Sequence, residues 1–503
     1  VDLTVHVQRG PDDAAIGRDD LAVALVAGHA VEQKAQQPPI DVLVVASTEL
    51  LRVVVGVAAI AVGECLIVPG RAGFDAIAVA VQVRATAIAD VGAARAEPAL
   101  EAHLDLPGRV IERVAREIAD GQHLAQFPVD VFQTGSGTST NMNVNEVIVA
   151  RAAQLAPAHG LALHANDDVN LSQSSNDVIP SALQVSVALA LHADLLPALA
   201  RLAAVLHVKA GEFASVVKPG RTHLMDATPI TLGQEFSGYA TQLDKAGERT
   251  LRAIALLAEL AIGGTAVGTG LNAPADFDVR MCAVLSLETG LEFRPARNHF
   301  EAQAARDDCV EVAGQLAAIA ASLTKLANDV RLLGSGPRAG LAELRLPAVQ
   351  PGSSIMPGKV NPVMSEMLIQ VGLYVQGLAQ TVMACGREGQ LELNATLPLQ
   401  AYCLHEAITC LANGADLFAT RCVEGLSADT AHCAELAAHS LMLVTALTPQ
   451  LGYDLAAEVA KQAQAQGLSL GEVLLQRGLM SKAEIERLLD PLRMTQVHST
   501  TAG

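Results

Sequence analysis

The chain has 503 residues and 51% of them are hydrophobic, which is enough to fill a sizeable core and excludes an intrinsically disordered protein. Its 53 acidic and 34 basic residues give a net charge of −19, so the overall field repels nucleic acids and anionic membranes. That field gives no long-range help to an anionic substrate either, so any anion site must be built from local donors.

The cysteines and the first residues bear on the cellular compartment. The eight cysteines show neither CxxC spacing nor a regular framework, which is typical of reduced thiols in the cytoplasm and does not favour structural zinc. The apolar run at residues 53–63 is far shorter than the ~20 residues of a membrane-spanning helix. Acidic residues at Asp2, Asp12 and Asp13 replace the basic start of a signal peptide, so we expect none.

The composition changes along the chain. Stretches rich in Val and Ile predict strands within the first 100 residues, at residues 41–45, 51–57 and 76–83. From about residue 180 alanine and leucine dominate, which favours closely packed long helices. We therefore expect a mainly α protein in three parts: an N-terminal domain over residues 1–173, a central bundle of long helices over residues 174–430, and a small helical domain over residues 431–503.

Three long helices are predicted in chain order. The first runs from Thr228 and Pro229, a capping residue and a proline, to about Leu260. The third follows the segment "GSSIMPGKVNP" (352–362), with Asn361 as N-cap and Pro362 at the first helical position. Helices of this length imply a bundle about 40 Å long. The second helix, residues 310–333, has a heptad seam formed by Val312, Leu316, Ile319, Leu323, Leu326, Val330 and Leu333.

Small polar residues gather in four segments of this otherwise apolar chain. These are "TGSGTSTNMNVNE" (134–146), "HANDDVNLSQSSND" (164–177), "GRTHLMDATP" (220–229) and the 352–362 segment. Each one alone is explained by a capped turn. Four of them beside predicted long helices favour a shared pocket.

Two other kinds of site are weakly indicated. The "GSG" at residues 135–137 lacks the lysine and the downstream acid of a nucleotide-binding loop, so we expect no nucleotide. His164 with Asp167 and Asp168 could ligate a metal, but no second histidine or cysteine stands at a supporting spacing. We therefore expect neither a metal nor another cofactor.

The 352–362 segment combines neutral hydrogen-bond donors with one cation, Lys359, which is what a carboxylate dianion requires. A lysine in a loop is otherwise simply solvated. His223, just before a predicted helix, is by default a polar residue satisfied at a domain junction. Glu366 in the first turn of its helix is ordinarily a favourable acid at a helix N-terminus, and it takes part in catalysis only if it also reaches a histidine.

These residues together resemble class II fumarase, within the fumarase and aspartase superfamily. The resemblance runs from about Leu106 to Met494, and "GSSIMPGKVNP" is its most specific signature. All four polar segments occur in the family's order, with "GGTAVGTGLN" (263–272) and "LGYD" (451–454). The first 100 residues do not match the family's usual start.

The resemblance favours fumarase over its relatives. Aspartases typically have Gln in place of His223, Thr in place of Ser175 and Ala in place of Gly358, and "GKVNP" argues against argininosuccinate and adenylosuccinate lyases. It implies a lyase that adds water reversibly to fumarate, giving L-malate, in a step of the tricarboxylic acid cycle. An aspartase-type ammonia-lyase and a non-catalytic structural member of the superfamily remain as alternatives.

By the same resemblance, the implied catalytic residues are Ser353 as the base toward carbon, His223 as the residue that assists the water, and Glu366 as the partner of His223. The implied substrate-binding residues are Ser136, Thr138, Ser174, Ser175, Asn176, Thr222, Ser354, Lys359, Val360 and Asn361. A second anion site is implied at His164, Ala165, Asn166 and Asp167. The only implied partners are the small dicarboxylate and further copies of the chain, in a homotetramer that shares the bundle and builds each site from three subunits.

Overall fold

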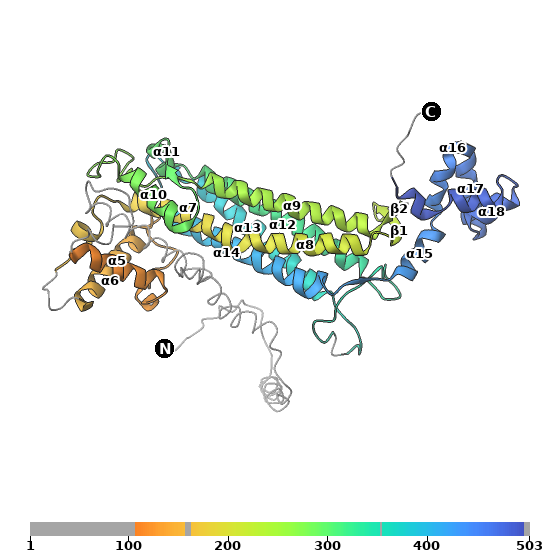
Figure 1. Ribbon diagram of the computed structural model, residues 1–503, viewed down its shortest axis with the longest axis horizontal. Helices are drawn as coiled ribbons and strands as arrows, with labels where there is room; N and C mark the ends of the chain where they lie inside the picture. Colours follow the sequence, from red (N-terminus) through yellow and green to blue (C-terminus); the bar gives the residue numbers. More distant parts are fainter. Residues whose placement is uncertain (1–105, 156–161, 353–354, 497–503) are drawn as a thin grey trace, which may run out of the picture. The chain divides into compact units, whose positions relative to one another are not determined.

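The computed structural model describes residues 106–155, 162–352 and 355–496 (Figure 1). The chain divides into two compact units, Val1–Val57 and Ala58–Gly503, and every described residue belongs to the second. The strands predicted between residues 41 and 83 lie outside the described residues. So do Ser353 and Ser354 of the 352–362 segment.

Long helices packed side by side form the centre of the second unit, which confirms the prediction of a mainly α protein with a helical bundle (Figure 1). The helices at residues 307–333 and 363–386 are antiparallel, because Gly372 lies against Thr324 whereas Gly386 lies against Val310. The helix at residues 397–418 runs parallel to the segment 175–212, because His405 contacts Ser186 and Arg201 pairs with Asp416. The bundle helices are α7 (Ser175–Ala190), η5 (Leu191–Leu195), α8 (Leu196–Glu212), α9 (Leu232–Leu256), α12 (Asp307–Leu333), α13 (Val363–Gly386) and α14 (Leu397–Phe418).

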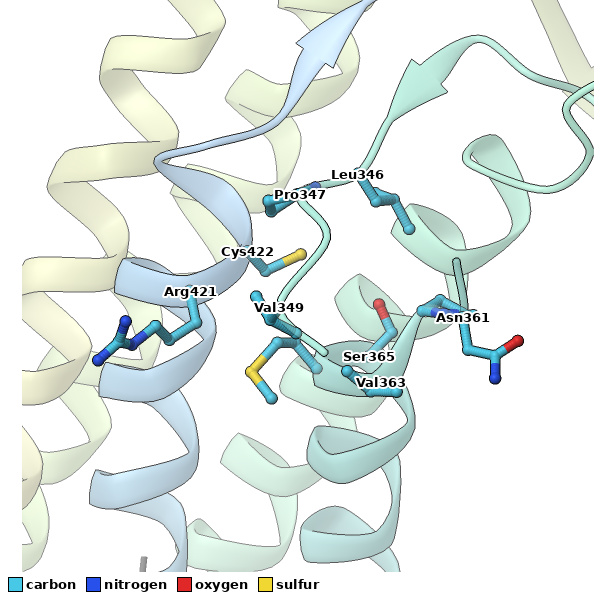
Figure 2. Close-up of a pocket in the computed structure, with 10 residues that line it drawn as sticks. Leu346, Pro347, Val349, Asn361, Val363, Ser365, Arg421 and Cys422 are labelled. Atoms are coloured by element: carbon cyan, nitrogen blue, oxygen red, sulfur yellow. The ribbon is translucent and has the colours of Figure 1, made fainter. Parts of the chain in front are cut away.

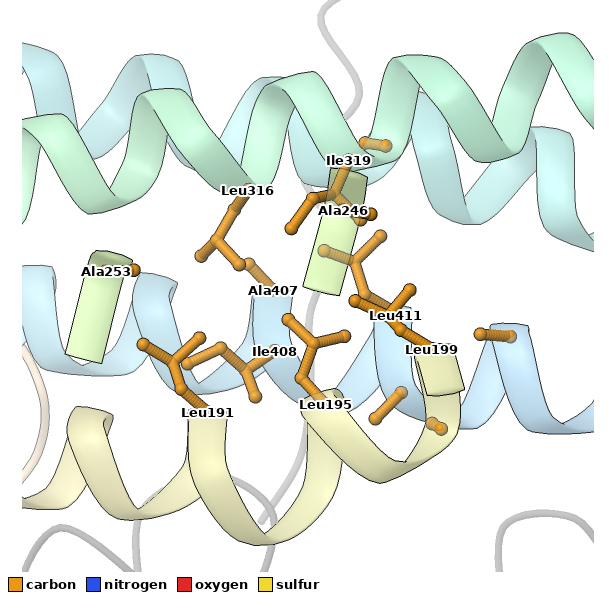
Figure 3. Close-up of a cluster of buried hydrophobic side chains, with 14 of the residues drawn as sticks. Leu191, Leu195, Leu199, Ala246, Ala253, Leu316, Ile319, Ala407, Ile408 and Leu411 are labelled. Atoms are coloured by element: carbon orange, nitrogen blue, oxygen red, sulfur yellow. The ribbon is translucent and has the colours of Figure 1, made fainter. Parts of the chain in front are cut away.

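The bundle core consists of aliphatic side chains from several helices. Figure 3 shows Leu195 of η5 and Leu199 of α8 close to Ile408 and Leu411 of α14. Small residues let the helices approach closely: a Cβ added at Gly372 of α13 would lie 2.0 Å from Thr324 Oγ1 of α12. The heptad seam predicted for residues 310–333 is confirmed, because all seven of its apolar residues are buried in α12.

Two predicted helix starts are wrong. Thr228 and Pro229 do not open a helix. They lie in β2 (Met225–Thr231), which pairs with β1 (Val217–Thr222) in an antiparallel hairpin. Helix α9 begins at Leu232 instead, because Thr231 Oγ1 accepts from Gln234 N and the Gln234 side chain accepts from Thr231 N in a capping box. Helix α13 begins one residue later than expected, with Pro362 rather than Asn361 at the N-cap.

Short elements connect the bundle helices. Between α9 and α12, β3 (Glu259–Leu260) pairs in parallel with β4 (Arg294–Pro295). β5 (Leu344–Arg345) pairs with β8 (Ser427–Ala428), and β6 (Gly389–Gln390) pairs with β7 (Leu393–Asn394). The short helices among them are α10 (Phe277–Thr289), α11 (His299–Ala304) and η6 (Ala419–Val423).

Two smaller apolar clusters lie beyond the bundle core. The first joins α5 (Leu106–Ala119) to α6 (Thr138–Leu155) through Ile111, Ile118 and Ile148. The second holds the C-terminal helices together through Leu447, Val459 and Val473. The other N-terminal elements are η2 (Leu124–Gln126) and η4 (Ala165–Val169). The C-terminal elements are α15 (Thr430–His439), η7 (Leu441–Leu447), α16 (Thr448–Leu451), α17 (Tyr453–Gln466), α18 (Leu470–Gln476), α19 (Lys482–Leu488) and α20 (Pro491–Met494).

Three helical segments are long and apolar enough to cross a membrane by length and composition alone: Ser175–Glu212, Asp307–Leu333 and Val363–Gly386. Between 39% and 50% of each apolar window is buried inside the chain, where Asp307–Leu333 packs against Val363–Gly386 and Ser175–Glu212 packs against α9 and α14. Their other faces remain open for further contacts.

A buried histidine makes the bundle sensitive to acid. His405 of α14 lies 2.8 Å through Nε2 from Ser186 Oγ of α7, and burial lowers its pKa to about 4. The unfolded chain binds a proton on this imidazole near pH 6.5, whereas the folded chain does not. The free energy of unfolding therefore falls as the pH drops from about 6.5 towards about 4.

We predict that this histidine alone lowers the free energy of unfolding by about 2 kcal/mol between pH 7.5 and pH 5. In His405→Gln, which keeps a hydrogen-bonding side chain but cannot titrate, that part of the pH dependence should be absent. Urea denaturation of both proteins at the two pH values, at one protein concentration, measures it. Equal pH dependence in the two proteins would contradict the assignment.

Candidate active site

A chain of hydroxyl groups links residues far apart in sequence. Ser136 Oγ lies 2.8 Å from Thr138 Oγ1, which lies 2.8 Å from Ser175 Oγ. Thr138 begins α6 and Ser175 begins α7, so two helix N-termini meet here. Close backbone contact creates this junction: the Leu397 N–H donates to the Gly135 carbonyl, and a Cβ on Gly135 would overlap the Ala395 carbonyl. Hydroxyls at two helix starts favour an anion.

The start of α7 also fixes the glycine-rich 263–272 segment. Ser174 is the N-cap of α7, and Asn176 Nδ2 donates to the Ala266 carbonyl at 2.8 Å. The carboxylate of Asp177 is fully buried and accepts hydrogen bonds from the backbone N–H groups of Ser174, Gly263 and Thr265.

Asp177 is a residue that the sequence analysis missed. Burial raises its pKa to about 7, although the three N–H donors act in the opposite direction. It shapes the segment around Ser175 and Asn176 rather than facing outward. The signal was present as the capping-box pattern Ser174-x-x-Asp177.

His223 lies at the tip of the β1–β2 hairpin, between Thr222 and Leu224, and all three residues are exposed. His223 and Leu224 have φ values of 55° and 60°, in the left-handed region that two-residue hairpin turns require. Since neither residue is glycine, the turn is strained. The sequence reading placed His223 before a helix and gave no signal for this hairpin.

The 352–362 segment closes on itself. Asn361 Nδ2 donates to the Gly352 carbonyl at 3.4 Å, and a Cβ on Gly352 would meet the Lys359 carbonyl oxygen. Lys359 and Val360 are exposed, and Lys359 forms no ion pair with any residue of 106–155, 162–352 or 355–496. Its charge is therefore available to a ligand.

Glu366, in the first turn of α13, is exposed. It forms no ion pair with His223 or with any other described residue of this chain. Figure 2 shows a small pocket behind this helix start, lined by Leu346, Pro347, Val349, Asn361 and Ser365 among others. Its volume of about 10 Å³ leaves room for about one water molecule. The polar clusters at Ser136, Ser174 and His223 do not line it.

One continuous helical run separates the predicted site residues into two groups. Residues Ser175–Glu212 form 38 consecutive helical residues, about 57 Å at 1.5 Å per residue. Ser136, Thr138 and Asn176 lie at its start, whereas His223 follows its far end (Figure 1). The 352–362 segment belongs to the far group, because Arg221 of the hairpin pairs with Glu343 shortly before it. A single chain therefore does not bring the two groups together.

The proposed second anion site has little positive charge to offer. His164 Nδ1 lies 3.0 Å from the Asp167 carboxylate, and the backbone N–H of His164 donates to Asp168 at 2.6 Å. Both side chains of the His164–Asp167 pair are exposed, and Ala165 begins the short helix η4. In the described part of the chain, no group of three or more His, Cys, Asp or Glu side chains is arranged to hold a metal ion.

Comparison with known proteins shows the family. A lyase family model matches residues 72–377, and a model of the fumarase C C-terminus matches residues 443–496. The first match begins 34 residues before Leu106, where the motif resemblance begins. Family similarity therefore extends into a stretch that the motifs did not connect to it.

Individual proteins agree with these matches. The chain is 53% identical over 387 residues to fumarate hydratase class II of Mycobacterium tuberculosis (strain H37Rv), covering 76% of this chain and 81% of that protein. It superposes on the crystal structure of class II fumarase from Schistosoma mansoni with a TM-score of 0.80 and 38% identity, over 85% of this chain and 91% of that one.

A fumarate lyase:delta crystallin structure from Brucella melitensis, bound to cobalt, superposes with a TM-score of 0.79 and 42% identity, over 85% and 92% of the two chains. Sequence relatives, family models and solved structures thus agree on one assignment. This chain is a lyase, and it belongs to the family of the class II fumarate hydratases.

Proposed function

We propose that the protein catalyses the reversible hydration of fumarate to L-malate. The observation that carries this proposal is the identity of 53% with a fumarate hydratase class II over 76% of the chain. The geometry supports it. Hydroxyls converge at two helix N-termini at one end of the bundle, and at the other end Lys359 forms no ion pair with a described residue. Brought together by assembly of several chains, these groups would suit a small dicarboxylate.

The reaction explains why a loop with many donors and one cation is useful. Removing a proton from the carbon next to a carboxylate builds a second negative charge on that carboxylate. Fixed donors and a nearby cation stabilise this charge as it forms. In our proposal Ser353 takes the proton, and Lys359 and the start of α13 favour its alkoxide.

In our proposal His223 exchanges a proton with the water that adds to fumarate. An imidazole can both accept and donate a proton, so in our proposal His223 takes a proton from water in one direction and returns it in the other. In our proposal Glu366 orients His223 in the assembled protein. The two carboxylates of the substrate bind to Ser136, Thr138, Ser174, Ser175, Asn176, Thr222, Ser354, Lys359, Val360 and Asn361.

We further propose that the site forms only when several chains assemble, as a homotetramer. The helical run of about 57 Å between Ser175 and Glu212, beyond which the hairpin follows, supports this, because a molecule the size of fumarate cannot touch both groups in one chain. The exposed face of α13 also supports it. This face begins at Glu366 and continues with the uncharged residues Gln370, Leu373, Gly377, Gln380 and Ala384. Another copy packed there would meet Glu366.

A reducing, cytoplasmic location is part of the proposal. The seven cysteines in the described ranges are free, and six of them are buried. Burial raises the pKa of Cys282 and Cys422 to about 12, so these thiols stay protonated and unreactive at neutral pH. Thiols in this state fit a protein that does not depend on disulfides.

We predict that purified protein converts L-malate to fumarate, seen as rising absorbance near 240 nm, and leaves L-aspartate unchanged. Ser353→Ala should lower kcat by at least about a thousandfold, because in our proposal Ser353 is the base that removes the carbon-bound proton. The helical circular dichroism should not change. Activity with aspartate alone would favour the ammonia-lyase alternative, and near-normal turnover in Ser353→Ala would remove the serine from the mechanism.

The same assay tests the histidine. His223→Asn should lower kcat by about a hundredfold or more, because asparagine cannot accept the proton from water. Its oligomeric state, measured by light scattering, should match that of the unaltered protein because His223 is exposed. An unchanged rate would contradict the role of His223.

Mixing two inactive variants tests whether the site is shared between chains. Ser175→Ala and His223→Asn alter opposite ends of the bundle, so a mixed oligomer contains some sites with neither change. Co-expression should therefore restore up to about one quarter of the unaltered activity if chains mix at random in a symmetric oligomer. As the control, the two variants are purified separately and mixed under conditions in which oligomers do not exchange chains. No recovery in verified mixed oligomers would show that each site comes from one chain.

A further inference from the structure

We propose that Glu343 is a positioning residue that fixes the hairpin carrying His223 to the segment leading into the 352–362 loop. This inference rests on the proposed function, because it concerns the orientation of His223 for that reaction. Glu343 contacts no predicted substrate-binding residue. It acts through two cationic side chains of β1.

A single buried carboxylate holds both cations of the hairpin. Glu343 is fully buried, and its Oε1 accepts a hydrogen bond from Arg221 Nη1 at 2.7 Å. Its Oε2 lies 3.2 Å from Lys218 Nζ, and Lys218 is only 2% exposed. Lys218 Nζ also donates to Glu235 Oε2 of α9 at 2.9 Å. The four groups carry two positive and two negative charges, so the network as a whole has no net charge.

The backbone of Glu343 is held independently of the hairpin. Its N–H donates to the Leu333 carbonyl at the end of α12, and its carbonyl accepts from the N–H of Asp429. The next residue, Leu344, pairs with Ala428 in the β5–β8 ladder. The carboxylate therefore presents a fixed point of the bundle to the hairpin, nine residues before Gly352 begins the loop.

The hairpin tip needs such a fixed point because little packing holds it. Residues 222–226 are all exposed, and the turn residues His223 and Leu224 have positive φ values. The pairing register is also irregular between Pro219 and Arg221. The direction of His223 therefore depends on how firmly the base of the hairpin is attached, and Arg221 is only two residues away. A displacement of about 1 Å can cost about a hundredfold in rate.

The network also links the two catalytic segments. Lys218 and Arg221 belong to the hairpin of His223, whereas Glu343 belongs to the chain that continues into Lys359. Both segments emerge at the same end of the bundle. Their relative position is therefore set within one chain, even though the complete site requires others.

The test compares Glu343→Gln, Arg221→Gln and a matched control, Arg345→Gln. Glutamine at 343 keeps the shape but leaves Lys218 and Arg221 with one negative partner between them. Arg221→Gln removes one ion pair at a partly exposed position. It therefore still tests the proposal if Glu343→Gln fails to fold. Arg345 is two residues from Glu343 and pairs with Asp429, but its side chain is largely exposed, so its loss should matter little.

Hydrogen–deuterium exchange of the full-length protein gives a readout that does not depend on activity. Peptides within residues 216–231 should exchange at least about tenfold faster in Glu343→Gln, less so in Arg221→Gln and not in Arg345→Gln. Peptides from α14 should exchange at the same rate in all proteins. Unchanged exchange in the hairpin would overturn the proposal. Faster exchange throughout the bundle would overturn it as well, because Glu343 would then support the fold in general.

Kinetics of the same variants with L-malate give the second readout. A misdirected His223 should lower kcat at least about tenfold in Glu343→Gln while KM changes less than about threefold, because Thr222 is the only one of the ten predicted substrate-binding residues on this hairpin. A rise in KM with unchanged kcat would overturn the positioning role. Inactivity of the unaltered protein would instead contradict the proposed function, and the exchange data would still decide whether Glu343 holds the hairpin.

Discussion

The length of the bundle helices is the constraint on which the rest of this structure depends. The run from Ser175 to Glu212 is rigid and continuous, so whatever chemistry lies at its start cannot reach what lies at its end. Hydroxyls and helix N-termini gather at one end, and a histidine, a lysine and a buried charge network gather at the other. In our proposal the site is completed when the start of one chain lies against the end of another. Close contacts between helices, such as that of Gly372 with Thr324, hold the bundle helices side by side.

Two buried acids hold together segments that are far apart in sequence, and the sequence motifs did not point to this role. Asp177 and Glu343 lie at opposite ends of the bundle, and neither faces a predicted substrate position. Each gathers donors from segments far apart in sequence: backbone N–H groups around Asp177, and the two cations of β1 around Glu343. A buried carboxylate that lost these partners would be costly, so each acid holds its segments in one arrangement. The exposed residues to which we assign the chemistry are attached to the segments that these buried acids hold.

Periodicity predicted the helices well and their boundaries less well. The seam of α12 was recognisable because seven apolar residues recur at heptad spacing without a proline, and all of them are buried. The start of α9 was misplaced because Thr228 and Pro229 have the form of a helix opening, yet they pair with β1. Strand pairing depends on residues ten positions earlier in the chain, and a local pattern does not contain that information. The same is true of Asp177, whose capping-box signal was visible but whose contacts with Gly263 and Thr265 were not.

The sequence by itself determined the family, the mainly helical class and the residue types available for chemistry. Motifs such as "GSSIMPGKVNP" and the polar segments around Ser136, Ser175 and His223 are local, so they can be read in order along the chain. Only the tertiary structure decided that Ser136, Thr138 and Ser175 share one hydrogen-bonded chain, that His223 lies on a strained hairpin, and that a helical run about 57 Å long separates these groups. The physical reason is that each of these facts depends on how helices and strands pack against one another. Packing is set by contacts between residues that are far apart in sequence.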